Sequence, residues 1–470
     1  MSDACVNCMK HFLKSLFTNC AGKLVSWNHT CGRPAWLVFL FVLGIMMAIL
    51  KPTAAYPQTR LNNLPDNWRQ SDIEQLAQQQ VINGSVGIPT QSAQREISLP
   101  DNTELRGVWL TNIDSDVLFS RNNTVSALES LKQLNFNTVY PTVWNWGYTL
   151  YPSKIAQGVM GSLARIATPL EEPFEPALGL GGRDVLQEIV DLGHQQGMRV
   201  IPWFEFGFMA PSDSELAKQH PDWLTQNAEG VKTKLEGIHE RVWLNPFMPE
   251  VQQFIQDLVI EIVSNYDIDG IQFDDHFGLP SDLGYDDFTV ELYQQEHQGK
   301  SPPTDSKDPE WVSWRANKVT DFLKQLVQAI KEQKEEVIIS ISPNPQRFSY
   351  EFFLADWENW EKLGLVDELI VQIYRDSFES FISELEQPEL KAAHSRIPVS
   401  IGILTGLKNK SVSMSQIQQQ VEAVRSRGFA GVSFFFYETL WKLTTEPLEQ
   451  RQTDFGLLFP LPVEAPELKH

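Results

Sequence analysis

The stretch YDIDGIQFDDHFGLP, from Tyr266 to Pro280, contains the feature that decides the fold. Its run GIQF predicts a short buried strand, because it is largely apolar. The strand ends in two adjacent carboxylates, Asp274 and Asp275, and His276 comes next. Two acids at the end of a buried strand raise the question of what they face.

Similar short apolar runs recur along the chain, and the segments between them have helical periodicity. The other predicted strands are Arg106–Ile113, Thr138–Asn145, Arg199–Phe208, Val337–Pro345, Glu368–Arg375, Ile397–Leu404 and Gly431–Thr439. The predicted helices include Asp184–Gln196, Pro249–Asn265, Trp311–Gln333 and Ser413–Arg427. Eight strands with a helix after each predict an α/β fold, a (β/α)8 TIM barrel. A doubly wound sheet would need a glycine-rich phosphate-binding turn after its first strand, and the sequence has none there.

Alternation within the predicted strands sends polar residues to one face of the sheet. In GIQFDD, Ile271 and Phe273 suit the side that faces the helices, so Gln272 and Asp274 face the barrel axis. The same reasoning places further side chains on the inner face near strand ends: Trp203, Glu205, Ser340, Ser342, Asn344, Gln372 and Tyr374. A purely structural barrel would fill its mouth with apolar layers, so these polar side chains favour a functional site.

The two adjacent acids are expected to point in different directions. Asp274 faces the axis, whereas Asp275 turns into the following loop, where it orients a neighbour or changes the pKa of its partner. The plainer alternative is a loop that begins with helix-capping aspartates. Glycoside cleavage needs two acidic functions, and the candidate partners are Glu205 and Glu438. Alternation favours Glu205 and leaves Glu438 open, because the strand before Glu438 is apolar throughout.

A metal site is the main rival interpretation of these acids. Phe-Asp-Asp also resembles the Asp pair of polysaccharide deacetylases, whose metal site a His-x-x-x-His pair completes. The nine histidines of the chain include no such pair, although His276 with Asp274 and Asp275 could hold a hard divalent ion. The sequence also lacks a Gly-x-Ser-x-Gly nucleophile motif. We therefore predict no cofactor and no metal ligand.

The composition favours one class of ligand and disfavours another. The formal net charge of -22 disfavours nucleic acid and anionic membrane surfaces. The 14 tryptophans favour carbohydrate, because indole faces stack on the C–H faces of sugars, but tryptophan also fills large cores. Trp109, Trp144, Trp146 and Trp203 lie at predicted strand ends, and each is either a sugar platform or a core residue.

The uncharged stretch Ala35–Leu50 is either a signal core or a transmembrane anchor. Basic residues upstream of it predict a cytoplasmic N-terminus and an exported body. All four cysteines precede it: they are reduced thiols of the leader or, with two histidines, a zinc knuckle. The latter set is Cys5, Cys8, Cys20, Cys31, His11 and His29.

The predicted organisation follows from these features: leader 1–34, membrane segment or signal 35–51, flexible linker 52–103, barrel 104–445 and C-terminal tail 446–470. The Pro- and Gly-rich segment 146–182 predicts a long loop that walls the cleft.

A wider set of motifs carries a resemblance to a known family. In order they are ELRGVWLTN, FNTVYPTVW, GRDVLQEIVDLGHQQGMRVIPWF, HPDWL, LNPFMPEVQQFI, YDIDGIQFDDHF, ISPNP and VQIYR. Over roughly Leu105–Trp441 the chain resembles the bacterial glycosyl-hydrolase-like family ten, formerly domain of unknown function 187. The resemblance implies a TIM barrel of extracytoplasmic, often membrane-anchored enzymes, whose characterised members hydrolyse cell-wall glycan strands stripped of their peptides.

The resemblance also bears on individual residues. It matches Asp274 and Asp275 to the family's strand-four acids and Trp203 to its strand-three tryptophan. The family often carries Asn where Glu205 stands, so this residue either lies outside the chemistry or marks a subgroup.

A more distant likeness suggests a second mechanism. DGIQFDD resembles the Asp-Gly-x-Asp-x-Asp-x-Glu of chitinase-type barrels, and Tyr374 stands near their strand-six tyrosine. Those enzymes use the substrate's own N-acetyl group as the nucleophile, and peptidoglycan sugars carry this group. His276 falls where their acid glutamate would be, so Asp275 or Glu205 would have to donate the proton. A two-carboxylate mechanism remains the first hypothesis.

These interpretations combine into one prediction. The protein is a hydrolase of O-glycosyl bonds that acts outside the cytoplasmic membrane, in the cell envelope or periplasm, anchored or secreted. Its substrate is an N-acetylated polysaccharide, in the first place peptidoglycan glycan, and it contacts the membrane through its N-terminal segment and binds no nucleic acid. The predicted catalytic residues are Asp274, Asp275 and Glu205. The predicted substrate-binding residues are Tyr374, Gln272, Gln372, Asn344, Trp203, Trp109, Trp144, Trp146, His276 and Glu438. The alternatives are a non-catalytic glycan-binding barrel and a metal-dependent deacetylase.

Overall fold

The computed structural model describes residues 103–160 and 183–468. The predicted leader, membrane segment and nearly all of the linker lie outside these residues, as do residues 161–182 of the predicted loop. Within the described ranges, no helix has the length and apolar character needed to cross a membrane.

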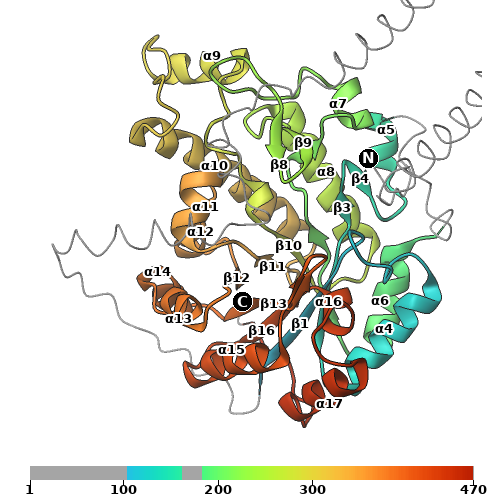
Figure 1. Ribbon diagram of the computed structural model, residues 1–470. Coiled ribbons are helices and arrows are strands. Elements are labelled where there is room, and N and C mark those ends of the chain that lie inside the picture. The colour runs from blue at the N-terminus through green and yellow to red at the C-terminus, as the bar shows by residue number, and fades with distance from the viewer. Residues whose placement is uncertain (1–102, 161–182, 469–470) are drawn as a thin grey trace, which may run out of the picture. The chain divides into compact units, whose positions relative to one another are not determined.

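A parallel sheet forms the centre of the fold (Figure 1). Its strands, in spatial order, are β5 (Arg199–Val200), β2 (Thr138–Pro141), β1 (Leu105–Leu110), β16 (Gly431–Phe435), β13 (Val399–Leu404), β12 (Glu368–Gln372), β11 (Ile338–Ile341), β10 (Gly270–Phe273) and β6 (Trp203–Phe204). The pairings among them are parallel, and each of the eight predicted strands is confirmed.

The two ends of this sheet belong to one segment of the chain. Only Ile201 and Pro202 separate β5 from β6. The backbone N–H of Ile201 donates to Val139 on one side, and that of Gln272 donates to Pro202 on the other. The sheet therefore curls until a single segment pairs with β2 at one edge and with β10 at the other.

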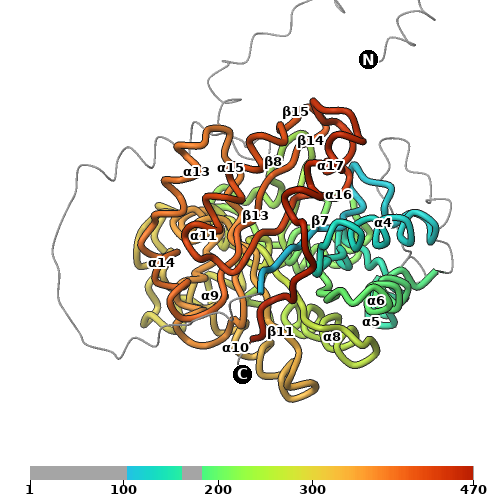
Figure 2. Tube along the Cα trace, turned by 90° about the horizontal axis from the view of Figure 1, so that it is seen from below, coloured from blue at the N-terminus to red at the C-terminus, as the bar shows by residue number. Residues whose placement is uncertain are grey.

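Helices pack around the outside of the curled sheet (Figures 1 and 2). Those that follow the sheet strands are α4 (Arg121–Gln133), α6 (Val185–Gln195), α8 (Pro249–Asn265), α10 (Pro309–Gln333), α11 (Gln346–Phe353), α12 (Trp357–Lys362), α13 (Phe378–Leu385), α14 (Pro388–His394), α15 (Met414–Ser426) and α16 (Tyr437–Trp441). Asp184, Asp308 and Ser413 each accept backbone N–H groups at a helix start, which explains where α6, α10 and α15 begin. All four helices predicted by range are confirmed, as α6, α8, α10 and α15.

Short elements are inserted after several of the strands. They are the hairpin β3 (Trp144–Asn145) and β4 (Tyr148–Thr149), helix α5 (Lys154–Met160), and the sheet of β7 (Met209–Pro211), β8 (Lys234–Glu236) and β9 (His239–Trp243), together with α7 (Glu215–Gln219), α9 (Asp287–Glu296) and the hairpin β14 (Gly406–Leu407) and β15 (Lys410–Ser411). The segment predicted as one long loop from residue 146 therefore begins with regular structure. Sequence periodicity missed β4 and α5 because both are too short to show a period.

Two apolar layers lie on opposite faces of the sheet. The outer layer, between strands and helices, includes Ile271 and Phe273. The inner layer is aromatic and consists of Leu105, Trp109, Tyr140, Ile201, Trp203, Ile338, Ile370 and Phe436. Burying each large side chain stabilises the fold by about 1.5–3 kcal/mol. The alternation predicted for GIQFDD is thereby confirmed for its apolar members.

The C-terminal segment packs against the rest of the fold. Helix α17 (Leu448–Leu458) is followed by Phe459, whose ring lies 5.4 Å from that of Phe136. Arg451 of this helix is fully buried and donates to the backbone carbonyls of Leu440 and Val412. Residues 448–459 thus form part of the core rather than a free tail.

Candidate active site

Strand β10 brings two acids to the C-terminal ends of the parallel strands. After Phe273 the chain enters a short 3-10 helix, η4 (Asp275–Phe277). Asp274 caps it, since its Oδ1 accepts from the backbone N of His276 at 2.9 Å. Gly207 lies against this turn, and a Cβ at Gly207 would lie only 2.2 Å from the carbonyl oxygen of His276. Only glycine permits this close approach.

Asp274 faces the axis of the sheet, as alternation predicts. Its side chain is buried, and its Oδ2 accepts from the indole Nε1 of Trp203 at 3.2 Å. Its Oδ1 lies 3.2 Å from Nδ1 of His276.

His276 connects Asp274 to a second carboxylate. Its Nε2 lies 3.6 Å from Glu236 on β8, and its Nδ1 lies 2.8 Å from the carbonyl oxygen of Glu205. Burial alone would lower the pKa of His276, but Asp274 and Glu236 outweigh burial and raise this pKa well above its ordinary value. These two carboxylates therefore favour the protonated form of the ring.

Glu205 follows β6 and is buried beside Asp274. Its Oε2 accepts from Thr111 Oγ1 at 3.4 Å, Thr142 Oγ1 at 3.0 Å and Asn145 Nδ2 at 2.5 Å. Burial, and then the negative charge of Asp274, raise the pKa of Glu205 to about 8. Glu205 is thus protonated at neutral pH. Its Oε1 makes no hydrogen bond with a described residue, so the proton can lie on that atom.

Asp275 turns away from the axis, toward the end of β11. Its Oδ2 accepts from the backbone N of Asn344 at 3.0 Å and from Nδ2 of Asn344 at 2.7 Å. Its Oδ1 is buried and has no hydrogen-bond partner among described residues. Burial raises the pKa of Asp275 in spite of the contacts with Asn344. The contact between Asp275 and Asn344 joins the ends of the neighbouring strands β10 and β11 and fixes the turn that carries Asp274.

Tyr374 contributes a hydroxyl group that the folded chain does not use. Its ring stacks on Phe435, with centroids 5.7 Å apart. The hydroxyl is buried and has no hydrogen-bond partner among described residues. Burial, and then the charge of Asp274, raise the pKa of Tyr374 well above its ordinary value, so the hydroxyl keeps its proton and can donate it.

The two predicted glutamines support the site from within the sheet. Gln272 is fully buried: its Oε1 accepts from Trp109 Nε1 at 2.7 Å, and its Nε2 donates to Ser340 Oγ at 2.9 Å. Gln372 is half-buried, and its Nε2 donates to the carbonyl oxygen of Ser342 at 2.6 Å. Both ends of the Gln272 amide are engaged, so its contacts are with the inner layer.

The four predicted tryptophans occupy three different environments. Trp109 and Trp203 lie in the inner layer, with ring centroids 6.3 Å apart. Trp144 is fully buried in the outer layer and packs edge-on against Phe254 of α8. Trp146 is half-buried and lines a pocket at the C-terminal ends of the strands.

Glu438 lies apart from the other candidate acids. It accepts from Ser115 Oγ at 3.1 Å and forms an ion pair with Lys442. No contact joins it to Asp274 or Glu205 within the described residues. The structure therefore brings Glu205, and not Glu438, next to Asp274.

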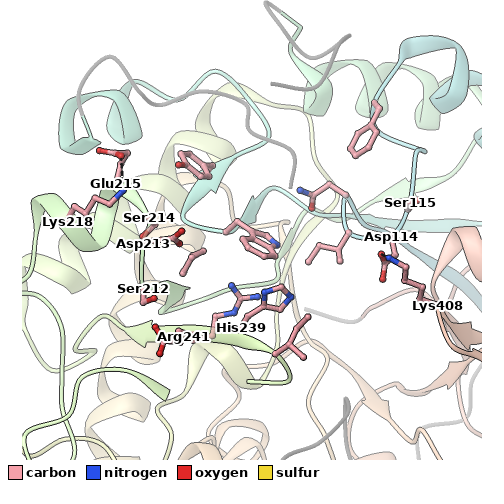
Figure 3. A pocket seen from close by; sticks show the side chains of 18 of the residues that line it. Asp114, Ser115, Ser212, Asp213, Ser214, Glu215, Lys218, His239, Arg241 and Lys408 are labelled. Atoms are coloured by element: carbon pink, nitrogen blue, oxygen red, sulfur yellow. Dashed lines mark hydrogen bonds and ion pairs between the residues drawn. The ribbon is translucent and has the colours of Figure 1, made fainter. Parts of the chain in front are cut away.

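The pocket has a volume of about 1290 Å³ (Figure 3). Arg241 and His239 of β9 lie side by side on its wall, and Asp114 and Lys408 lie on the opposite side. Asn112, which also lines the pocket, accepts from Nδ2 of Asn145 at 3.0 Å, and the same nitrogen donates to Glu205. Glu205 thus lies directly behind the pocket wall.

Several residues near the acids were not predicted. Thr111, Thr142 and Asn145 are polar residues near the ends of the first two predicted strands, a signal that could have identified them. Glu236 and Arg241 lie on the β8–β9 hairpin, for which the alternation of the barrel strands gives no information.

The directions of the two aspartate side chains bear on the alternative interpretation, a metal site. The side chains of Asp274 and Asp275 diverge, because Asp275 binds Asn344. Across residues 103–160 and 183–468, no group of three or more His, Cys, Asp or Glu side chains is arranged to hold a metal ion.

Comparison with known proteins yields one family and several relatives. The sequence profile of the family described as Glycosyl hydrolase-like 10 matches residues 104–424. The chain is 27% identical over 312 residues to glycosyl hydrolase DigH of Escherichia coli O6:H1, a match that covers 57% of this chain and 65% of that protein. It is 24% identical over 304 residues to glycosyl hydrolase YngK of Bacillus subtilis, covering 58% of this chain and 54% of that protein. The chain thus spans less than two thirds of the length of either relative.

The fold is also similar to that of a solved structure. The catalytic domain of beta-amylase from Paenibacillus polymyxa superposes with a TM-score of 0.50 at 11% identity, covering 73% of this chain and 95% of that domain. At this identity the likeness concerns the fold alone.

Proposed function

The chain belongs to the family Glycosyl hydrolase-like 10, and from that premise we propose that it hydrolyses O-glycosyl bonds of an N-acetylated polysaccharide, in the first place peptidoglycan glycan strands. The proposal includes a finer description of the fold, a closed (β/α)8 barrel. The single segment Arg199–Phe204, which supplies both ends of the sheet, supports that description.

One observation carries the proposed chemistry: two buried acids lie close together in different surroundings. Glu205 is protonated at neutral pH, since its pKa is about 8, whereas Asp274 accepts from the indole of Trp203 and lies 3.2 Å from Nδ1 of His276. Glycosidases use such a pair, one acid that protonates the leaving oxygen and one carboxylate that attacks the anomeric carbon or activates water.

The positions of the donors indicate how each acid acts. Three donors converge on Oε2 of Glu205, which leaves Oε1 to carry the proton toward the glycosidic oxygen. When the C–O bond breaks, this proton goes to the leaving sugar, and Asp274 balances the positive charge that develops at the anomeric carbon. Water then adds to that carbon and returns a proton to Glu205. Asp275 acts as a positioning residue through Asn344.

The substrate class rests on the polar groups that the folded chain leaves unused. The hydroxyl of Tyr374 lies within the electrostatic influence of Asp274 and can donate to an acetamide carbonyl or a sugar hydroxyl. Trp146 offers an aromatic surface on the pocket wall. A pocket of about 1290 Å³ exceeds the size typical of a site for one small molecule, as a polymer substrate requires.

We also propose that the enzyme acts outside the cytoplasmic membrane. Support comes from the apolar stretch Ala35–Leu50 with basic residues upstream, which lies outside the described residues. Protease accessibility tests this in cells that carry an epitope-tagged full-length chain: protease added to spheroplasts should degrade the part of the chain that follows the apolar stretch.

The decisive test of activity is the release of reducing ends from peptide-free peptidoglycan strands by the purified protein. Release that is lost in Asp274→Asn and Glu205→Gln supports the proposal. Binding without release, unchanged by Asp274→Asn, would instead identify a glycan-binding barrel. Release of acetate that chelators abolish would identify a deacetylase.

A further inference from the structure

Arg241 on β9 is a buried cation that has the carboxylates of Glu236, Asp213 and Glu205 nearby but forms no close ion pair with them. Its side chain is 5% exposed, and it makes no hydrogen bond or ion pair with a described residue. Two other buried arginines differ: Arg315 donates to backbone carbonyls, and Arg451 pairs with Glu446. Its buried Nε has no acceptor among described residues, and a buried donor without an acceptor is costly, so Arg241 can bind an acceptor group such as a carboxylate from outside the chain.

The surroundings of Arg241 form part of the pocket wall. Its guanidinium lies over the ring of Trp146, 4.2 Å from the centroid, and 5.2 Å from that of Phe206. Figure 3 shows it next to His239, facing the space that the pocket residues enclose. The planar contact with Trp146 holds the guanidinium in place, so that it is already oriented for a ligand.

The charge of the pocket restricts the kind of anion that fits. The acids that line the same pocket repel a doubly charged phosphate more strongly than a single carboxylate; they are Asp114, Asp116, Asp213, Glu215 and Glu240. A single carboxylate on an otherwise neutral sugar unit reduces that repulsion, and its geometry matches the guanidinium fork. The ring of Trp146 contacts Arg241 and stacks on Phe206, and its indole Nε1 is a donor that has no hydrogen-bond partner among described residues.

A second unused group lies on the same wall. Asn112 is 1% exposed, lines the pocket, and its Nδ2 has no hydrogen-bond partner among described residues. Through Asn145 it connects to Glu205. A ligand bound at this wall therefore lies next to the proposed acid.

We propose that Arg241, Trp146 and Asn112 form a subsite for a sugar unit that bears one carboxylate. The inference rests on the proposed glycosidase function and refines it, because it makes the substrate an acidic N-acetylated glycan. Two sources supply that chemistry: the lactyl ether of a muramyl unit and the C6 carboxylate of a uronate.

The test measures binding in the Glu205→Gln background, where turnover does not interfere. Calorimetric titration compares peptide-free peptidoglycan strands with the same strands after reduction of their carboxyl groups to alcohols. Hyaluronan oligosaccharides, native and carboxyl-reduced, form the uronate arm. The titrations are repeated with Arg241→Gln, with Arg241→Lys, and with Arg427→Gln, an exposed arginine that pairs with Glu386 and serves as the matched control.

We expect one of the two glycans to bind about 10- to 100-fold more tightly than its reduced form. Arg241→Gln should bring this ratio close to one, Arg241→Lys should retain part of it because Lys keeps the charge without the fork, and Arg427→Gln should leave it unchanged. The glycan that shows the preference identifies the source.

Ratios near one for both glycans, or a ratio that Arg241→Gln leaves intact, overturn the subsite. These results differ from failure of the proposed function. If the protein prefers the native glycan to its carboxyl-reduced form but releases no reducing ends, the subsite is supported and the hydrolase function is contradicted. If it cleaves native and reduced strands equally, the hydrolase function is supported and the subsite is contradicted.

Discussion

Two buried glutamates lie on the inner face of the same sheet, and they differ in their neighbours. Glu205 follows β6 at the C-terminal ends of the strands, and Glu368 begins β12 at the N-terminal ends. Burial raises the pKa of both. Glu368 accepts from the hydroxyl of Tyr140 at 3.3 Å, and the positive charge of Arg199 lowers its pKa more than the negative charge of Asp367 raises it; Glu205 instead has the negative charge of Asp274 beside it. Burial is therefore common to both acids, whereas Glu205 is connected through Asn145 to Asn112, which lines the pocket.

The same contrast extends to polar atoms without partners. Those at the C-terminal ends of the strands are Asn112 Nδ2, Asn145 Oδ1, Trp146 Nε1, Arg241 Nε, Asp275 Oδ1 and Tyr374 Oη. At the opposite end, Arg199 also leaves one nitrogen unpaired, but it donates with another to the carbonyl oxygen of Pro466. Unpartnered buried polar atoms also occur elsewhere among the described residues, at Trp243, Trp311, His394, Gln420, Ser433 and Trp441, so the difference between the two ends is one of degree. A bound ligand can offset the cost of such groups.

Replacement of the two glutamates gives the largest expected difference. Glu205→Gln should lower kcat for glycan hydrolysis by about 10²–10⁴-fold, because the amide cannot donate a proton to the leaving oxygen. Glu368→Gln should retain wild-type kcat. Reducing-end release by both variants, with circular dichroism as the check on folding, decides this. Equal losses in the two variants would remove the distinction between the two ends.

The pH dependence of activity should follow the proton on Glu205. Because the active form is protonated and its pKa is about 8, kcat/KM should fall about tenfold per pH unit above that value. The measurement is a pH profile of kcat/KM for the wild type, with Glu368→Gln as the control that keeps the alkaline limb. A profile that stays flat to pH 10 would contradict the assignment.

The same proton affects stability with a defined sign. The pKa of Glu205 in the folded protein is about 8, above its ordinary 4.5, so the folded state binds a proton that the unfolded state releases. The free energy of unfolding should therefore fall by up to about 1.4 kcal/mol per pH unit as pH rises between these values, relative to Glu205→Gln. Urea titrations of both proteins across this range measure the difference. A difference independent of pH would mean that Glu205 is ionised throughout.

The contact between Asp275 and Asn344 should matter less for activity. Asn344→Ala removes one donor to Asp275 and leaves an acceptor in a buried site, so it should destabilise the protein by about 1–3 kcal/mol. We expect kcat to fall by about tenfold, with KM nearly unchanged, because the turn that carries Asp274 loosens. Thermal unfolding and steady-state kinetics test both parts, and Asn344→Asp, which places two acids together, should be worse than Ala.

Tyr374→Phe should have the smallest effect, and it should separate stability from activity. Its hydroxyl has no partner in the folded chain, so the free energy of unfolding should not fall. Loss of a hydrogen bond to substrate should lower kcat/KM by about two- to tenfold. A clear loss of stability instead would show that the hydroxyl is satisfied within the protein.

The site residues that could be predicted from the sequence lie in or directly after regular strands. In GIQFDD the alternation correctly sends Asp274 inward and Asp275 into the turn, because β10 is straight up to Phe273. The same rule gave no guide to Trp144 and Trp146. The strand β2 ends at Pro141, and those residues belong to the next hairpin, where Trp146 adopts a positive φ of 56°.

The alternation of side chains along the sheet strands gives no information about the hairpin β8–β9. It contributes Glu236 and Arg241, whose roles depend on contacts with His276 and Trp146 far away in the sequence. Glu205 could be proposed from its strand position. Its protonation could not, because it arises from burial and from Asp274 across the sheet.

The most direct measurement compares two substrates in Glu205→Gln. One is the natural glycan, whose leaving sugar needs a proton, and the other is an N-acetylglucosaminide with a dinitrophenolate leaving group, which needs none. If Glu205 is the proton donor, the variant should cleave the aryl glycoside at nearly the wild-type rate while its rate on the glycan falls by about 10²–10⁴-fold. Equal losses on both substrates, or no loss on either, would contradict this role.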